Sequence, residues 1–228
     1  MMVVLLLDLH YWNMKSIYLG PTYDLSAIEG DPITPRQVAS LLAFGEKDVD
    51  LESGKFYSMQ NRKVIAIFQG RSEAGPRALG NRSILYDPRD PAGRDKINTI
   101  KHREAFRPFA GTVLKEHANK YFDMAGLDES PYMTFAVDVR EEWVDNIPAI
   151  NHVDNTCRVQ TVTREQNQHF YDLIVEFQKF SSIPILLNTS FNLAGEPMVE
   201  TPEDAIRTLE GSDIDYIYFP EIGKLRGK

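Results

Sequence analysis

The spacing of apolar residues predicts strands and helices that follow one another without strict alternation. Residues 64–68 are all apolar and rich in β-branched types, which predicts a buried strand. A second apolar run at 183–187 predicts another. Weaker patterns indicate strands at 134–139, 158–162 and 216–219, and a turn leading into a strand within 106–114. We therefore expect an α/β (α+β) fold, a mixed, twisted open sheet with helices packed on it.

Helices are predicted where apolar residues recur every three or four positions. The apolar residues at i, i+3, i+4 and i+7 from Phe170 have this spacing. Thr34 and Thr201 each precede a proline, which pairs a capping hydroxyl with a residue suited to the first helical turn. Residues 93–104 and 115–122 also have helical patterns, and the first of these two segments is rich in basic side chains.

The first thirty residues show no periodic pattern beyond an apolar run at 1–7. That run is too short to span a membrane and has no basic flank, so we interpret it as an edge strand or a leader of little consequence. We expect residues 1–30 to be a lead-in and 31–228 to form the domain. A single cysteine, Cys157, excludes an internal disulfide and favours a reducing, cytoplasmic setting.

Charge is distributed unevenly along the chain. The net charge is -8, which argues against a dedicated nucleic-acid-binding protein. Residues 62–107 nevertheless contain eleven Lys/Arg and five Asp/Glu, so this window is +6 and the remainder is -14. A basic region within an acidic protein suits a small polyanion better than a duplex.

The loop that follows the strand at 64–68 combines glycines with arginines. Glycine lets the backbone approach a ligand closely, and a guanidinium fits phosphate or carboxylate oxygens. We therefore expect this loop to grip an anion, against the alternative of a surface turn with solvated arginines. Its residues are Gly70, Gly75 and Gly80, with Arg71, Arg77 and Arg82 among them.

Two further stretches have more polar character than a scaffold requires. Lys101, Arg103 and Arg107 lie within seven residues, and we expect Arg107 to be partly buried and to need an anionic partner. The alternative is a helix C-terminus with basic side chains. Asn188, Ser190 and Asn192 lie at the end of the strand at 183–187, where amides and hydroxyls can receive phosphate oxygens, although ordinary turn chemistry would also explain them.

Metal and nucleophile chemistry is less well supported. His152 and Asp154 lie two residues apart, a pattern that indicates a satisfied hydrogen bond more often than a metal site, and we assign no metal ligands. His152 remains a candidate for substrate binding. The spacing of Gly70 and Gly75 matches a P-loop, but Pro76-Arg77 stands where Lys-Ser/Thr is required.

Four stretches of the chain resemble a known family: GRSEAGPRALGNRSILYDPRD, IKHREAFRPFAGTVL, IPAINHVDNTCRVQTV and ILLNTSFNLAGEPMVETPEDA. They are similar to the C-terminal domain of the O-carbamoyltransferases of nodulation and antibiotic biosynthesis, and the similarity extends over residues 18–219. Ala74 replaces the usual aromatic residue, and Asn155 and Cys157 replace the usual Gly and Ala. These departures alter the wall of a pocket without changing its charge.

The resemblance implies a YrdC-like fold that uses ATP and carbamoyl phosphate, with Mg²⁺, to make a carbamoyl-adenylate. It also implies that Lys101, Arg103, Arg107, Ser190 and Asn192 surround the nucleotide. The three loop arginines are our choices for the carbamoyl phosphate or triphosphate oxygens, from charge and position alone. In the family, a separate N-terminal, metal-dependent domain passes the carbamoyl group to an acceptor hydroxyl. We expect a partner chain to supply that domain, or this chain to be a fragment.

Three other interpretations remain open. In the first, the chain is a non-catalytic ATP- or nucleotide-binding module that acts through a partner protein. In the second, it is an enzyme that makes threonylcarbamoyl-adenylate from bicarbonate and threonine. An RNA-binding protein is the third, and the overall negative charge disfavours it.

Overall fold

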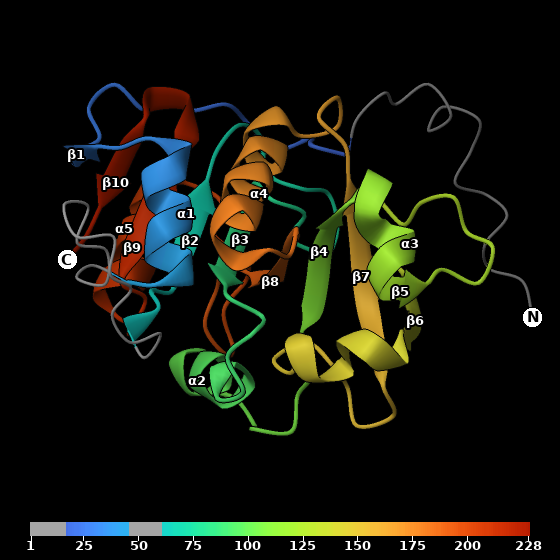
Figure 1. The fold of residues 1–228 in the computed structure, drawn as a ribbon. Helices are drawn as coiled ribbons and strands as arrows, with labels where there is room; N and C mark the ends of the chain where they lie inside the picture. Colours follow the sequence, from blue (N-terminus) through green and yellow to red (C-terminus); the bar gives the residue numbers. More distant parts are fainter. Residues whose placement is uncertain (1–16, 46–60) are drawn as a thin grey trace, which may run out of the picture.

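A computed structural model describes residues 17–45 and 61–228. Its strands form one ten-stranded sheet in the order β1-β10-β9-β2-β3-β8-β4-β7-β6-β5 (Figure 1). Two neighbouring pairs, β2 with β9 and β4 with β7, are parallel, and the other neighbouring pairs are antiparallel. The prediction of a mixed open sheet is confirmed. The apolar run at 1–7 lies outside the described residues.

The strands are short, and the most buried of them lie in the middle of the sheet. Every residue of β2, β3 and β4 is buried, as are the first four of β8. Strands buried on both faces need covering layers on both sides. The strands are β1 Asp31–Pro32, β2 Ile65–Phe68, β3 Arg82–Tyr86, β4 Ala110–Leu114, β5 Phe122–Asp123, β6 Phe135–Val139, β7 Thr156–Val162, β8 Ile185–Ser190, β9 Tyr216–Phe219 and β10 Lys224–Arg226.

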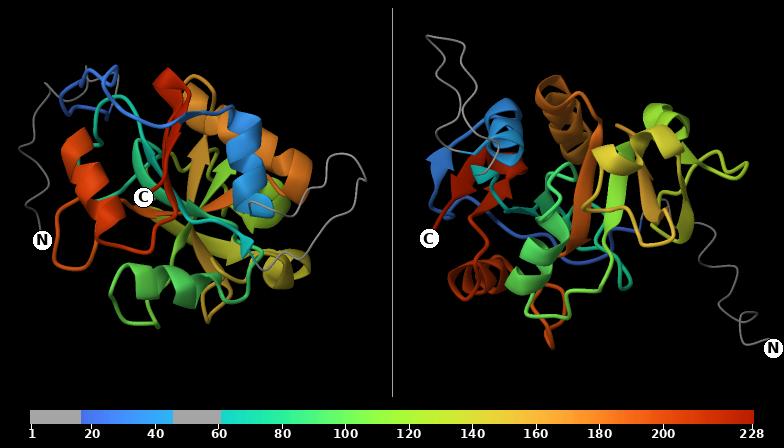
Figure 2. Two further views of the ribbon diagram at one scale, coloured as in Figure 1. Left: turned by 90° about the vertical axis from the view of Figure 1, so that its left-hand side faces the viewer. Right: turned by 60° about the horizontal axis from the view of Figure 1, so that its bottom comes forward.

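Helices cover the sheet on both sides. α1 and α4 pack against each other on one face, and α5 lies on the opposite face (Figure 2). Thr34 and Thr201 form capping boxes at the starts of α1 and α5, as their sequences predict. The α-helices are α1 Pro35–Ala43, α2 Gly93–Ile100, α3 Ala118–Tyr121, α4 Gln168–Ser181 and α5 Pro202–Glu210; the 3₁₀ segments are Lys115–His117, Glu141–Asn146 and Pro220–Ile222.

Three boundaries differ from the sequence-based expectations. Arg82 begins strand β3 instead of belonging to the loop, because residues 82–86 pair with both β2 and β8. β8 continues to Ser190, since its polar end still pairs with β3. The helix predicted over 93–104 ends at Ile100, and His102 adopts a left-handed conformation (φ 54°) that stops it.

Candidate functional site

A cavity of about 650 Å³ lies where the segment after α2 meets the segment after β8. Its charged lining consists of Lys101, Arg103, Arg107 and one carboxylate, Glu104. Ser190 and Asn192 line the facing wall. The structure thus brings together two of the three stretches that the sequence singles out, and the cavity between them has an excess of positive charge suited to an anion.

Lys101 joins the two walls. Its ammonium donates to the Ser190 carbonyl (2.5 Å), the Asn192 carbonyl (2.8 Å) and Asn192 Oδ1 (2.9 Å). The Ser190 hydroxyl in turn donates to Asn192 Oδ1 (2.6 Å), and the Ala194 amide donates to the Lys101 carbonyl. The side chain is only 3% exposed, and burial, aided by Arg103, lowers the pKa of Lys101 to about 7. Lys101 therefore stabilises the turn at 190–192 as well as adding charge to the cavity.

Arg103 and Arg107 differ in exposure. Arg103 is half-buried: its Nε donates to Asn98 Oδ1 (2.6 Å) and its guanidinium stacks on the Phe109 ring. Burial, together with the nearby cationic arginines, lowers the pKa of Arg103 to about 10. Arg107, expected to be partly buried, is instead 53% exposed and pairs with Glu104 at 3.1 Å. That expectation was wrong, because the loop after α2 carries Arg107 out to the rim of the cavity.

Arg158, on β7, is a cationic neighbour that the sequence analysis did not single out. Its Nε is buried and has no hydrogen-bond partner among the described residues. Burial lowers the pKa of Arg158, and Arg77 lowers it further; Arg158 also acts on Arg103. The charge of Arg77 therefore acts on Arg158, and the charge of Arg158 acts on Arg103. A signal was present in the sequence, since Arg158 and the buried Gln160 are polar residues two apart on one strand face.

The glycine-arginine loop does hold a carboxylate, and that carboxylate belongs to Glu73. Glu73 Oε1 accepts from the backbone amides of Leu79 (2.7 Å), Asn81 (2.8 Å) and Arg82 (3.3 Å). The side chain is 5% exposed, and burial raises its pKa, although these hydrogen bonds oppose the shift. The amides expected to bind a ligand are thus occupied from within the loop.

Two of the three loop arginines are engaged with backbone oxygens. The Arg82 guanidinium is buried, stacks on Phe68, and donates to four carbonyls, those of Gln69, Gly70, Asn81 and Glu200. Arg71 donates to the carbonyls of Leu19 and Gly20. Arg77 is exposed at the tip of the loop. Of the three, Arg77 is the one whose charge lowers the pKa of another arginine, Arg158.

Asn188 and His152 lie in ordered polar networks. Asn188 is 1% exposed and donates to Thr112 Oγ1 and Gln160 Oε1 (both 3.0 Å), and its own Oδ1 has no partner among the described residues. His152 contacts the Thr156 hydroxyl through Nδ1 and the Phe109 carbonyl through Nε2 (both 3.1 Å). The carbonyl contact fixes Nε2 as the protonated nitrogen.

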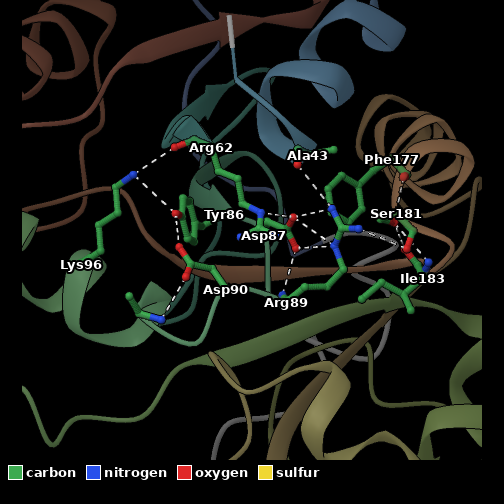
Figure 3. Close-up of polar contacts among 11 residues, drawn as sticks. Ala43, Arg62, Tyr86, Asp87, Arg89, Asp90, Lys96, Phe177, Ser181 and Ile183 are labelled. Atoms are coloured by element: carbon green, nitrogen blue, oxygen red, sulfur yellow. Dashed lines mark hydrogen bonds and ion pairs between the residues drawn. The ribbon is translucent and has the colours of Figure 1, made fainter. Parts of the chain in front are cut away.

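The helix that leads into Lys101 is anchored by a buried ion cluster (Figure 3). Asp87 is fully buried and contacts Arg62 (2.7 Å) and Arg89 (2.6 Å). Lys96, on α2, donates to the Arg62 carbonyl (2.9 Å), and Tyr86 donates to Asp90 (2.6 Å). These contacts fix α2 against the sheet and so fix the position of Lys101.

No group of three or more potential metal-ligating side chains occurs within residues 17–45 and 61–228. Over the same residues, no helix has both the length and the apolar character needed to cross a bilayer. The cation that accompanies a nucleotide is held largely by phosphate oxygens and water, so a dedicated protein cage is not required for it.

The family model "Carbamoyltransferase C-terminus" matches residues 57–223. This chain belongs to the carbamoyltransferase family. It is 48% identical to nodulation protein NolO of Bradyrhizobium diazoefficiens, covering 89% of this chain and 37% of that protein. It is 51% identical to nodulation protein NolNO of Sinorhizobium fredii, covering 89% and 30%. The chain therefore spans about a third of the length of these relatives.

Solved structures place this carbamoyltransferase-family domain in the YrdC-like fold, as expected. Sua5 of P. abyssi, complexed with L-threonine, superimposes with a TM-score of 0.52 at 13% identity, covering 81% of this chain and 46% of that one. Full-length HypF in its phosphate- and nucleotide-bound form superimposes with a TM-score of 0.50 at 18% identity, covering 81% and 27%. At these identities the likeness concerns the fold alone.

Proposed function

We propose that this chain is the carbamoyl-adenylate-forming part of an O-carbamoyltransferase, and that it uses ATP and carbamoyl phosphate. The observation that carries the proposal is the cavity in which Lys101 ties the 190–192 turn to a wall bearing Arg103 and Arg107. In the reaction, water first releases phosphate from carbamoyl phosphate and leaves carbamate. A carbamate oxygen then attacks the α-phosphorus of ATP, a new O–P bond forms, and the bond to pyrophosphate breaks.

Such a transfer requires positioning and charge neutralisation more than a titrating base. In the proposal, Arg103, Arg107, Ser190 and Asn192 contact the nucleotide, and Lys101 keeps the turn in place while contributing charge. Mg²⁺ accompanies ATP and neutralises its phosphates. An acceptor hydroxyl is carbamoylated elsewhere, by another domain or a partner chain, and the setting is cytoplasmic.

In this proposal, the second substrate, carbamoyl phosphate, binds next to the nucleotide. The charge of Arg77 acts on Arg158 and that of Arg158 on Arg103, and the buried Nε of Arg158 lacks a partner in the described chain. Phosphate fits this arrangement because its oxygens accept several charge-assisted hydrogen bonds at once. We therefore assign carbamoyl phosphate to Arg77 and Arg158. Arg71 and Arg82 are not assigned to substrate, because their donors are engaged with backbone carbonyls.

Pyrophosphate release from ATP tests the proposal. With Mg²⁺ present, we expect release that depends on carbamoyl phosphate. Arg107→Ala should abolish most of the release. Arg207→Ala removes another exposed arginine that pairs with an acidic residue three positions earlier, but one outside the cavity lining, and should have no effect. ATP binding without release under any condition would favour a non-catalytic nucleotide-binding module. Release that depends on bicarbonate and threonine would point to threonylcarbamoyl-adenylate.

A further inference from the structure

The loop at 73–82 is closed by a side chain rather than by a ladder of backbone hydrogen bonds. The outgoing limb ends at Glu73, whose backbone forms a β-bridge with Tyr18, and the Ala74 amide donates to the Ile17 carbonyl (2.8 Å). The returning limb begins at Ala78. Between them, residues 74–77 are all exposed.

Glu73 makes the contacts between the two limbs that lie nearest the tip, whereas Asn81 and Arg82 join the limbs further back by donating to the carbonyls of Arg71 and Gly70. Glu73 Oε1 accepts hydrogen bonds from the backbone amides of Leu79, Asn81 and Arg82. The other oxygen is buried and has no partner within the described residues. The carboxyl therefore lies inside the loop, in the position that a bound anion occupies in a backbone anion nest.

The returning limb is also held from outside, by side chains of the sheet. The Leu79 carbonyl accepts from Gln160 (3.0 Å) and from the Tyr18 hydroxyl (3.2 Å), and the Ala78 carbonyl accepts from Asn188 (3.3 Å). These bonds fix the limb after Arg77, whereas Glu73 ties that limb to the one before it. The exposed tip, residues 74–77, is therefore fixed at both ends. Because only four residues lie between the fixed points, the position of Arg77 is restricted.

We propose that Glu73 is a positioning residue that holds Arg77 beside Arg158. The inference rests on the proposed function, in which those two arginines bind carbamoyl phosphate. Glu73 itself contacts no substrate, because its side chain is buried within the loop. Its role is to exclude conformations of the tip that the mutual repulsion of Arg77 and Arg158 would otherwise favour.

A first experiment examines the loop without reference to any ligand. Trypsin cleaves after arginine, and Arg77 is exposed at the tip. We expect Glu73→Ala to raise the cleavage rate after Arg77 at least ten-fold, and Glu73→Gln, which retains an acceptor oxygen, to give an intermediate rate. The control is Glu200→Gln, which changes a carboxylate that accepts from the Ser72 hydroxyl, next to Glu73, but contacts no amide of residues 79–82.

Unchanged cleavage after Arg77 in a folded Glu73→Ala protein overturns the proposal. If that variant does not fold, the decision passes to Glu73→Gln, and cleavage at the wild-type rate again overturns it. Thermal unfolding of each variant separates a local opening of the tip from general destabilisation, because only a local change leaves the melting temperature and cleavage at other arginines unaltered.

A second experiment connects the loop to the ligand. Carbamoyl phosphate is titrated calorimetrically into wild type, Glu73→Gln, Arg77→Ala and the double variant. If Glu73 acts through Arg77, each single change weakens binding and the double variant binds no more weakly than Arg77→Ala; additive losses overturn the proposal. Wild-type protein that does not bind carbamoyl phosphate contradicts the proposed function instead, and the proteolysis result still decides the role of Glu73 in the loop.

Discussion

The Lys101 ammonium lies 2.9 Å from Oδ1 of Asn192, a residue 91 positions away in the sequence. The same ammonium donates to both backbone carbonyls that flank Phe191. Three oxygen acceptors favour the charged form of the amine, whereas burial disfavours it. The protonation of Lys101 is therefore sensitive to any further charge that enters the cavity.

This sensitivity predicts proton uptake on ligand binding. The pKa of Lys101 is about 7 without ligand, so the amine loses its proton as the pH rises through 7. A bound anion favours the ammonium and raises this pKa. We expect ATP affinity to fall as the pH rises from about 7, and calorimetry near that pH in buffers of different ionisation enthalpy to show proton uptake.

Lys101→Met is the matched variant for this prediction. It keeps the apolar length of the side chain and removes the titrating amine. Its ATP affinity should therefore be lower than that of wild type at pH 7 and should change less with pH. A variant with the wild-type pH profile would show that another group titrates. A folded variant is expected, since Met fills a similar volume and the hydrogen bond from the Ser190 hydroxyl to Asn192 Oδ1 still holds the turn.

Arg158→Ala should weaken the binding of carbamoyl phosphate about 10- to 100-fold, the equivalent of one lost charge-assisted hydrogen bond of about 1.5–3 kcal/mol. The buried Nε without a partner in the described chain is the reason for this expectation. Calorimetry measures the loss. Arg140→Ala, which removes an exposed arginine just after β6, is the control and should leave the affinity within two-fold of wild type.

Gly80→Ala and Gly75→Ala form a matched pair in the loop. Both glycines have positive φ, +108° and +107°, where alanine costs about 1 kcal/mol or more. A Cβ at Gly80 would also lie 2.3 Å from the buried ring of Phe170, whereas one at Gly75 would meet nothing within 4 Å. We expect Gly80→Ala to lower the free energy of unfolding by at least about 3 kcal/mol and Gly75→Ala by about 1 kcal/mol. Urea denaturation measures the free energy of unfolding of both variants. Equal losses in the two would contradict the close packing at Gly80.

Asp87→Ala should destabilise the fold by about 3–5 kcal/mol, because it leaves the Arg62 and Arg89 guanidinium groups without their shared carboxylate. Asp172→Ala removes the partner of an exposed arginine, Arg164, and should cost no more than about 1 kcal/mol. Chemical denaturation at neutral pH measures both. Similar losses in the two variants would mean that the Asp87 cluster adds little to stability.

The sequence supplied the two walls of the cavity but not the residues that depend on tertiary burial. Lys101, Ser190 and Asn192 were singled out because their residue types and positions after regular elements are unusual for a scaffold. Glu73 was missed because an acidic residue in a glycine-rich loop is expected to be solvated. Its carboxyl meets three amides only once the chain at 79–82 turns back.

Element boundaries failed where long-range pairing overrides local preference. Arg82 and Ser83 are poor candidates for a buried strand, yet β3 is buried because it lies between β2 and β8. The short strands β1 and β10 were not expected, since residues 31–32 and 224–226 pair only with each other and with β9. No local pattern carries that information.

The place of β8 between β3 and β4 has a consequence for synthesis on the ribosome. β3 and β4 are synthesised before β8, but neither pairs with the other, and each has β8 as a neighbour in the sheet. In a nascent chain that ends before residue 185, β8 is missing from between β3 and β4. The edges of β3 and β4 that face this position are then unpaired. The central sheet, and the cavity beside it, can form only after β8 at residues 185–190 has emerged, so this domain is expected to fold late during its own synthesis.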